Sequence, residues 1–146
     1  MIQHQAVILG VLALAAPATA GPEGRYSERQ ILDAIRQVES GGRDDCPDGD
    51  GGRSIGPYQV QRAYWEDATS FDPSLGGTYQ DCRKRGYAEK VIRAYMRRYV
   101  SAAWTRLDAE RIARTHNGGP RGASKTSTIA YWKKVQAELQ KSKPRN

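Results

Sequence analysis

The chain has 146 residues, and its 23 lysine and arginine side chains against 16 aspartate and glutamate side chains give a net charge of +7. Once an N-terminal leader is set aside, this length suffices for one hydrophobic core and excludes two full-sized domains. The positive charge favours polyanionic partners, and nucleic acid and an anionic cell wall are the two main classes.

The first 20 residues have the pattern of a secretory signal peptide. An apolar run, AVILGVLALAA, is followed by PATA, in which Ala18 and Ala20 form an Ala-x-Ala cleavage site before Gly21. The run is too short to span a bilayer comfortably. We therefore predict a signal peptide at residues 1–20 and a single domain at residues 21–146, secreted or periplasmic and free of the membrane after cleavage.

The first predicted helix begins at Ser27, which forms a capping-box pattern with Gln30, and ends before Gly41 and Gly42. Its apolar positions have helical spacing. They are Ile31, Ala34, Ile35 and Val38. Glu39 lies in the last turn of this helix. A carboxyl on a helix rim that faces a second carboxyl is the arrangement that acid-assisted glycosidic cleavage requires, while the alternative is an ordinary solvated glutamate.

The segment 43–57 is rich in glycine and aspartate, so we predict a loop or a short irregular hairpin. It carries four aspartates, Asp44, Asp45, Asp48 and Asp50. It also carries Cys46, one of only two cysteines, the other being Cys82. In an exported chain an even pair suggests a disulfide, so we predict one between them.

Three further helices and a connecting loop are predicted along the middle of the chain. A short helix covers residues 58–68, a connecting loop covers 71–82, and the strongest helix covers about 83–103. The last has an apolar face with i, i+3, i+4 spacing, typical of a central core helix. Its members are Ala88, Val91, Ile92, Tyr95, Met96 and Tyr99. Asp108 is placed to cap another short helix that runs to about His116 and ends at Asn117–Pro120.

The last predicted helix starts near Thr126 or Ser127. Its apolar positions are Ile129, Trp132, Val135 and Leu139. The fold class is therefore α+β and mainly α, with a small irregular hairpin after the first helix. The basic residues are scattered and form no single DNA-reading helix, so we expect no nucleic-acid partner. With no CxxC motif and only two histidines, we expect no metal and no cofactor.

Four local sequences, in this order, resemble the invertebrate-type lysozymes, the group that includes destabilases. They are VESGG (38–42), SIGPYQV (54–60), YAEKVIRAYMRRY (87–99) and ARTHNGGPRG (113–122), together with the YW pairs at residues 64–65 and 131–132. Any one of them is a weak signal, while the ordered set is strong. The animal members of this family are rich in disulfides, and this chain departs from them with two cysteines.

The resemblance implies a lysozyme-like fold and cleavage of the β-1,4 bond between N-acetylmuramic acid and N-acetylglucosamine in peptidoglycan. It places the general acid at Glu39. The second carboxylate falls at Asp50 with a shift of one residue, and Asp48 is the competitor. A retaining mechanism needs the two carboxyl groups close together.

The resemblance also implies substrate contacts. Tyr58 and Gln59 would offer a stacking face and an amide to the sugar rings, with core packing as the alternative for Tyr58. His116, Asn117 and Gly118 would contact N-acetyl groups, and His116 would also suit a helix C-terminus as a cation.

The leading hypothesis is a secreted, bacteriolytic muramidase that acts as a monomer on peptidoglycan. Two alternatives stay open. One is a lytic transglycosylase-like reaction that uses Glu39 alone, and the other is a non-catalytic module that binds the cell wall.

Overall fold

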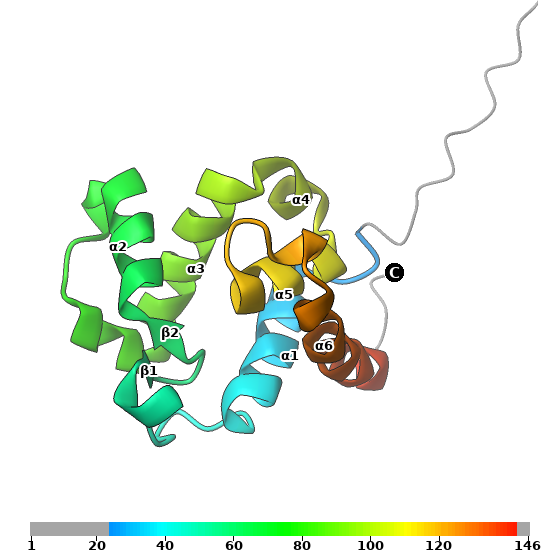
Figure 1. Ribbon diagram of the computed structural model, residues 1–146, viewed down its shortest axis with the longest axis horizontal. Coiled ribbons are helices and arrows are strands. Elements are labelled where there is room, and N and C mark those ends of the chain that lie inside the picture. The colour runs from blue at the N-terminus through cyan, green and yellow to red at the C-terminus, as the bar shows by residue number, and fades with distance from the viewer. Residues whose placement is uncertain (1–23, 143–146) are drawn as a thin grey trace, which may run out of the picture.

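The computed structural model describes residues 24–142, so the predicted signal peptide lies outside the described residues. Within that range the chain forms six α-helices, one two-stranded hairpin and short 3-10 helices (Figure 1). This is the mainly helical α+β class predicted from the sequence. None of the helices between residues 24 and 142 is long and apolar enough to cross a membrane.

Helix α1 spans Glu28–Ser40, and its two ends follow from the sequence as predicted. At its start the Gln30 amide N–H donates to the Ser27 hydroxyl, and the Ser27 amide N–H donates to the Gln30 side chain. Gly41 ends the helix in the left-handed conformation, with φ 64° and ψ 27°. Ile31 and Ile35 are fully buried, so the predicted apolar face is the one that packs into the core.

The hairpin consists of β1 (Ser54–Ile55) and β2 (Val60–Gln61), which pair antiparallel directly after the 3-10 helix η1 (Asp50–Gly52). Its turn requires glycine at Gly56, where φ is +71° and a Cβ atom would lie 2.1 Å from the carbonyl oxygen of Cys82. The prediction of a helix from residue 58 is wrong at its start. Because residues 60–61 pair with β1, helix α2 begins only at Arg62.

Helix α2 spans Arg62–Phe71 and is followed by 3-10 helices η2 (Pro73–Leu75) and η3 (Tyr79–Arg83). The predicted helix 83–103 is divided into α3 (Arg85–Tyr99) and α4 (Ser101–Arg106). The break lies at Val100, whose φ of −139° and ψ of 43° are not helical. Its side chain is 7% exposed, so the chain changes direction while this apolar residue stays in the core.

Helix α5 (Ala109–Gly118) begins as predicted, because the Asp108 carboxylate accepts a hydrogen bond of 3.0 Å from the Arg111 amide. Two 3-10 helices, η4 (Gly122–Ser124) and η5 (Thr126–Thr128), lead to α6 (Ile129–Lys141). The inward face of α6 is formed by Val135 and Leu139, which are buried as predicted. Ile129 is 40% exposed and lies outside the core, because it occupies the first turn of α6, at the edge of that face.

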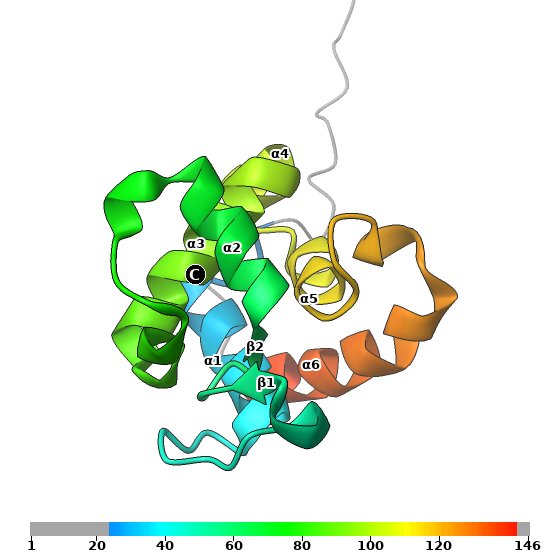
Figure 2. The ribbon, with the colours of Figure 1, turned by 60° about the vertical axis from the view of Figure 1, so that its left-hand side comes forward.

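The helices pack mainly in pairs. Helix α1 packs against α6, α6 packs against α5, and α2 packs against α3. Figure 1 shows the hairpin on one side of α1 and α6 on the other. In Figure 2 the hairpin lies beside the start of α2, with α5 and α6 to its right. The end of α1 that carries Glu39 therefore lies between the hairpin and the C-terminal helices.

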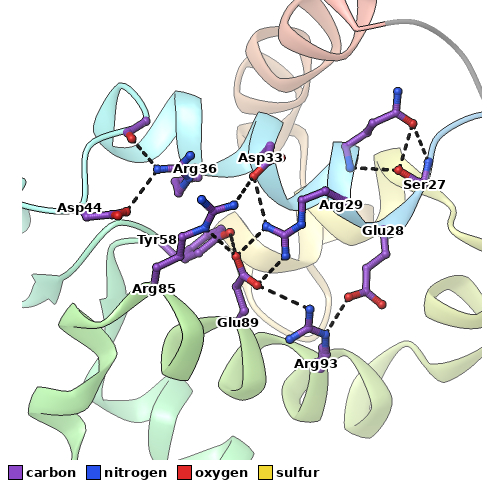
Figure 3. A network of polar contacts seen from close by, with 12 residues as sticks. Ser27, Glu28, Arg29, Asp33, Arg36, Asp44, Tyr58, Arg85, Glu89 and Arg93 are labelled. Atoms are coloured by element: carbon purple, nitrogen blue, oxygen red, sulfur yellow. Dashed lines mark hydrogen bonds and ion pairs between the residues drawn. The ribbon is translucent and has the colours of Figure 1, made fainter.

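A buried carboxylate joins α1, α3 and the hairpin turn (Figure 3). The side chain of Glu89 accepts hydrogen bonds from Arg29 at 2.5 Å and from Arg85 at 3.0 Å, and Arg93 lies 3.5 Å away. The Tyr58 hydroxyl donates to the same carboxylate at 2.8 Å. Burial alone would raise the pKa of Glu89, but these hydrogen bonds outweigh it and hold the pKa at about 2. The charged network therefore fixes the turn of the hairpin to the helical core.

The two cysteines differ from their predicted pairing. The structure has Cys46 and Cys82 as free cysteines, with no bond between them. Cys82 is fully buried, and this burial raises the pKa of its thiol to about 12. A thiol in that setting stays protonated and is a poor nucleophile.

Candidate active site

A cavity of about 780 Å³ lies between the end of α1, the hairpin and the C-terminal end of α5. Most of the site residues predicted from the sequence line this cavity, although they come from segments far apart in the chain. Those in its lining are Glu39, Asp50, Gln59, His116, Asn117 and Gly118. Polar groups that the sequence analysis had not proposed also line it, including Ser54, Gln61, Asp67 and Lys125.

Glu39 lies in the last turn of α1, where its side chain is 18% exposed. The hydroxyl of Tyr131 donates a hydrogen bond of 2.7 Å to its Oε1 atom. Burial raises the pKa of Glu39 to about 7; the hydrogen bond from Tyr131 opposes this rise, the charge of Asp50 adds to it, and that of Lys134 opposes it. A large fraction of this carboxyl therefore carries a proton at neutral pH.

Asp50 is the first residue of η1 and has the opposite electrostatic setting. Its Oδ2 atom accepts hydrogen bonds from the Ser54 hydroxyl at 2.8 Å and from the Gln61 amide at 3.2 Å. These two hydrogen bonds, with Ser54 contributing most, lower the pKa of Asp50 below its ordinary value. Asp50 is also held with φ at +50°, in the left-handed region that aspartate tolerates better than most residues.

The two carboxyls of the cavity therefore titrate apart. Glu39 keeps its proton to about pH 7, while Asp50 is ionised well below that. A pair of acids whose environments separate their pKa values in this way divides naturally into a proton donor and a charged partner. The pKa values of the two groups differ because Glu39 is buried, whereas the carboxylate of Asp50 accepts hydrogen bonds.

Asp48, the competing aspartate, faces away from this cavity. Its carboxylate forms a two-point ion pair with the guanidinium of Arg83, in which the Nη2–Oδ2 bond is 2.9 Å. It lines a separate hollow with Arg83 and does not line the cavity that holds Glu39. The structure thus brings Asp50, and not Asp48, together with Glu39.

His116 lies behind Glu39 as a buried, neutral imidazole. Its side chain is 3% exposed, and burial lowers its pKa to about 4. Nε2 lies 3.1 Å from the Tyr58 carbonyl oxygen and Nδ1 lies 3.3 Å from the Tyr64 hydroxyl. A neutral ring that donates from Nε2 and accepts at Nδ1 satisfies both contacts. The prediction of a cationic helix cap is therefore wrong, because the buried ring does not hold a second proton.

Tyr58 does not reach the cavity, so the predicted stacking role of its ring is wrong. Its side chain is fully buried and donates to Glu89, which leaves core packing as its role. Its neighbour Gln59 does line the cavity, but its amide donates to the Gly56 carbonyl oxygen at 2.9 Å. The tight turn at Gly56 turns Tyr58 inward and uses the Gln59 amide to close the loop.

Two tyrosines that the sequence did not assign to the site support Glu39 and His116. Tyr131 holds Glu39 directly, and Tyr64 both lines the cavity and contacts His116. The rings of Tyr64 and Tyr95 are stacked, with centroids 3.6 Å apart. Both Tyr64 and Tyr131 belong to the YW pairs that carry the family resemblance, and this is the feature of the sequence that points to them. Their distance in sequence from Glu39 and His116 does not predict that they contact these residues.

Residues 24–142 contain no group of three or more His, Cys, Asp or Glu side chains placed to hold a metal ion. The chemistry that the lining can supply by itself is proton transfer, charge stabilisation and hydrogen bonding.

Comparison with known proteins gives consistent matches. Residues 28–138 match the family described as Destabilase. The chain is 37% identical over 115 residues to a lysozyme of Meretrix lusoria, and the match covers 77% of this chain and 91% of that protein. It is 31% identical over 116 residues to an invertebrate-type lysozyme of Ruditapes philippinarum, covering 77% and 82% of the two chains. A match to lysozyme 1 of Crassostrea virginica is 38% identical but spans only 59% of that longer protein.

Solved structures show the same likeness. The crystal structure of Tapes japonica lysozyme superposes with a TM-score of 0.63 at 31% identity, covering 77% of this chain and 90% of that one. The lysozyme of Meretrix lusoria in complex with Aeromonas hydrophila PliI gives a TM-score of 0.64 at 37% identity, covering 78% and 91%.

Proposed function

The chain belongs to the destabilase family of invertebrate-type lysozymes, and on that premise we propose that it is a muramidase. The bond it hydrolyses is the β-1,4 link between N-acetylmuramic acid and N-acetylglucosamine in peptidoglycan. The observation that carries this proposal is the cavity that holds two carboxyls with opposite pKa shifts. Such a pair is what acid-assisted cleavage of a glycosidic bond needs.

Glu39 is the general acid in this mechanism. With a pKa of about 7 it carries the proton that the leaving sugar oxygen requires as the bond between that oxygen and C1 breaks. After the leaving group departs, the ionised Glu39 accepts a proton from the incoming water. The 2.7 Å hydrogen bond from Tyr131 holds the carboxyl in place through both steps.

Asp50 is the second carboxylate. It is ionised throughout, so its negative charge either stabilises the oxocarbenium-like sugar or attacks C1 as a nucleophile. Hydrogen bonds from Ser54 and Gln61 fix the side chain and keep it ionised. Asn117 and Gly118, at the end of α5, lie across the cavity and supply polar groups for the N-acetyl substituents.

The direct test is turbidity clearing of a peptidoglycan suspension by purified wild type and Glu39→Gln. We expect Glu39→Gln to lose at least about 100-fold in rate, since general acid catalysis typically contributes a factor of that size or more. Glu66→Gln is the matched control, because Glu66 is exposed on α2 and does not line the cavity. Equal clearing by wild type and Glu39→Gln would overturn the proposal.

The second carboxylate is tested by a similar pair of variants. Asp50→Asn should lose most activity, whereas Asp48→Asn should retain it, because Asp48 pairs with Arg83 outside the cavity. An unchanged rate in Asp50→Asn would remove that assignment. Mass spectrometry of the products identifies the reaction. A reducing end that has gained one water indicates hydrolysis, and a 1,6-anhydro end indicates cleavage by Glu39 alone. Wall binding without either product would indicate a non-catalytic module.

The same proposal includes the cellular setting. Export is supported by the signal-peptide pattern of residues 1–20, and peptidoglycan as partner is supported by the lysozyme names of the matched relatives. We expect the exported protein to act as a monomer. Size-exclusion chromatography with light scattering measures this directly.

A further inference from the structure

A second hollow, of about 710 Å³, adjoins the active-site cavity. The two share Gln61 and Ala63 in their linings. Three arginines line the second hollow, Arg53, Arg62 and Arg83, against a single carboxylate, that of Asp48. The side chains that line this hollow therefore have a net charge of +2, whereas the neighbouring active-site cavity is lined by the carboxyls of Glu39 and Asp50. The positive charge suits the hollow to an anionic group.

We propose that this arginine hollow binds the free carboxylate groups of the stem peptides that branch from the glycan. The inference rests on the proposed function, because the glycan must lie in the active-site cavity for its peptide branch to enter the hollow. Carboxylates are planar two-oxygen acceptors, and guanidinium groups bind them in a two-point geometry. The sugar backbone of the substrate needs no such group.

One of the three guanidinium groups, that of Arg62, is held in position by the protein itself. Arg62 lies over the ring of Tyr79, with its central carbon 4.6 Å from the ring centroid. Tyr79 is 7% exposed, and its hydroxyl lies within hydrogen-bonding distance of the carbonyl oxygens of Arg53, at 3.0 Å, and Val60, at 2.9 Å. The ring is thus fixed to both sides of the hairpin. A cation stacked on a fixed ring keeps its N–H edge available for a carboxylate and loses less freedom on binding.

The other two arginines, Arg53 and Arg83, each form a contact with the protein. The Arg53 Nε atom donates to the Asp50 carbonyl oxygen at 2.9 Å, and Arg83 is paired with Asp48. Among residues 24–142, neither Arg53 nor Arg62 forms an ion pair with a carboxylate. Arg62 therefore has no carboxylate partner within the described part of the chain, whereas the charge of Arg53 also acts on Asp50 and helps to lower its pKa.

The connection between the two sites lies at Gln61. Its side chain donates to Asp50, at the catalytic end, while the residue also lines the arginine hollow. Arg62 directly follows Gln61 in the chain and lines the same hollow. In this proposal, a peptide branch that leaves a muramic acid bound near Asp50 passes Gln61 and reaches Arg62. The hollow thereby distinguishes peptidoglycan with free stem-peptide carboxylates from peptidoglycan whose carboxylates are neutralised.

Arg62→Gln tests the proposal, with Lys90→Gln as the control that removes one exposed positive charge from α3 without touching either site. Two substrates are compared, both freed of phosphate-containing wall polymers: peptidoglycan with free stem-peptide carboxylates, and the same peptidoglycan after carbodiimide coupling to methylamine has converted those carboxylates to neutral amides. We expect Arg62→Gln to lower kcat/KM on the substrate with free carboxylates roughly three- to tenfold, as for one exposed charge-assisted contact. On the amidated substrate Arg62→Gln should equal wild type. Arg62→Lys, which keeps the charge but not the planar fork, should fall between the two.

Equal effects of Arg62→Gln on both substrates, or no effect on either, would overturn the inference. Pull-down of each variant with both insoluble substrates provides a readout without turnover, and the Arg62→Gln defect should appear only with the form that has free carboxylates. This separates the two proposals. If wild type cuts neither substrate but binds the form with free carboxylates through Arg62, the muramidase proposal fails while the carboxylate site stands.

Discussion

The pKa values of Glu39 and Asp50 differ because the immediate surroundings of the two carboxyls differ. Glu39 is taken out of water at the end of a packed helix, which raises its pKa to about 7, with the Tyr131 hydrogen bond working against that rise. Asp50 remains near solvent and is surrounded by donors, which lowers its pKa. The helix and the loop that carry these residues could be predicted from the sequence, but the burial of Glu39 and the Ser54 contact of Asp50, which set their charge states, could not.

Tyr131→Phe should raise the pKa of Glu39 above about 7, because the lost hydrogen bond favours the ionised carboxylate. A general acid must be protonated, so the alkaline limb of the kcat/KM profile should move to higher pH by roughly one unit, the size expected for one hydrogen bond to a charged group. The pH–rate profile on peptidoglycan measures this shift. Tyr26→Phe, at a tyrosine that does not line the cavity, serves as the control. An alkaline limb that stays in place would contradict the role given to Tyr131.

Glu39→Gln should stabilise the fold in a pH-dependent way. The folded pKa of about 7 lies above the reference value of 4.5, so the native state binds the proton more tightly than the unfolded chain does. The stability this provides is complete below about pH 4.5 and is lost as pH rises through about 7. Glutamine avoids the loss, so the free energy of unfolding should exceed that of wild type by about 2–3 kcal/mol at about pH 8 and match it at about pH 4. Urea denaturation at both pH values measures this, and a constant difference would contradict it.

At the scale of elements, the ends of α1 and α5 and the turn of the hairpin decide where the site forms. Capping residues end or begin these helices where the sequence predicts, so Glu39 and Asn117 reach the cavity from packed helix ends. The hairpin is held differently, through the buried Glu89 network that receives the Tyr58 hydroxyl. The Tyr58 carbonyl oxygen in turn contacts His116 behind Glu39. The network therefore supports the site as well as the core.

Glu89→Gln should destabilise the protein by about 3 kcal/mol at neutral pH, since removing one member of a buried charged network leaves its partners uncompensated. The pKa of Glu89, about 2, lies below its reference value of 4.5. Its contribution is therefore present above about pH 4.5 and is lost as pH falls through about 2. The difference from wild type should shrink accordingly in urea denaturation at acid pH. Glu138→Gln, in an exposed pair with Lys141, should change stability by less than about 0.5 kcal/mol.

At the scale of the whole molecule, the net charge of +7 suits an anionic cell wall. The charge is spread over several elements and includes the arginine hollow beside the active-site cavity. In the proposed function, long-range attraction brings the protein to the wall, and the carboxyl pair acts only after a glycan strand has entered the cavity. Affinity for the wall and chemistry on the glycan are therefore separable.

Binding of Glu39→Gln to isolated walls should weaken steeply with added salt, because exposed charges are screened beyond about 10 Å at ~0.1 M ionic strength. Sedimentation of the bound protein at increasing NaCl concentration measures it. The contrasting readout is the circular dichroism spectrum of the same protein, which should stay unchanged over the same range. Salt-independent wall binding would show that the net charge is not what attracts the protein.

Most of the helices, the position of Glu39 at a helix end and the glycine-rich loop beside it can be predicted from the amino-acid sequence. These depend on local periodicity, caps and turn residues, which act over a few residues. Three features become visible only in the folded chain: Asp50 and not Asp48 lines the cavity with Glu39, Tyr58 turns into the core, and both cysteines are free. Each of these depends on which side a short loop presents to segments many residues away, such as Arg83 for Asp48 and Glu89 for Tyr58. In a glycine-rich loop, a shift of one or two residues can turn a side chain from one side of the loop to the other. The local sequence pattern does not predict which side faces those distant segments.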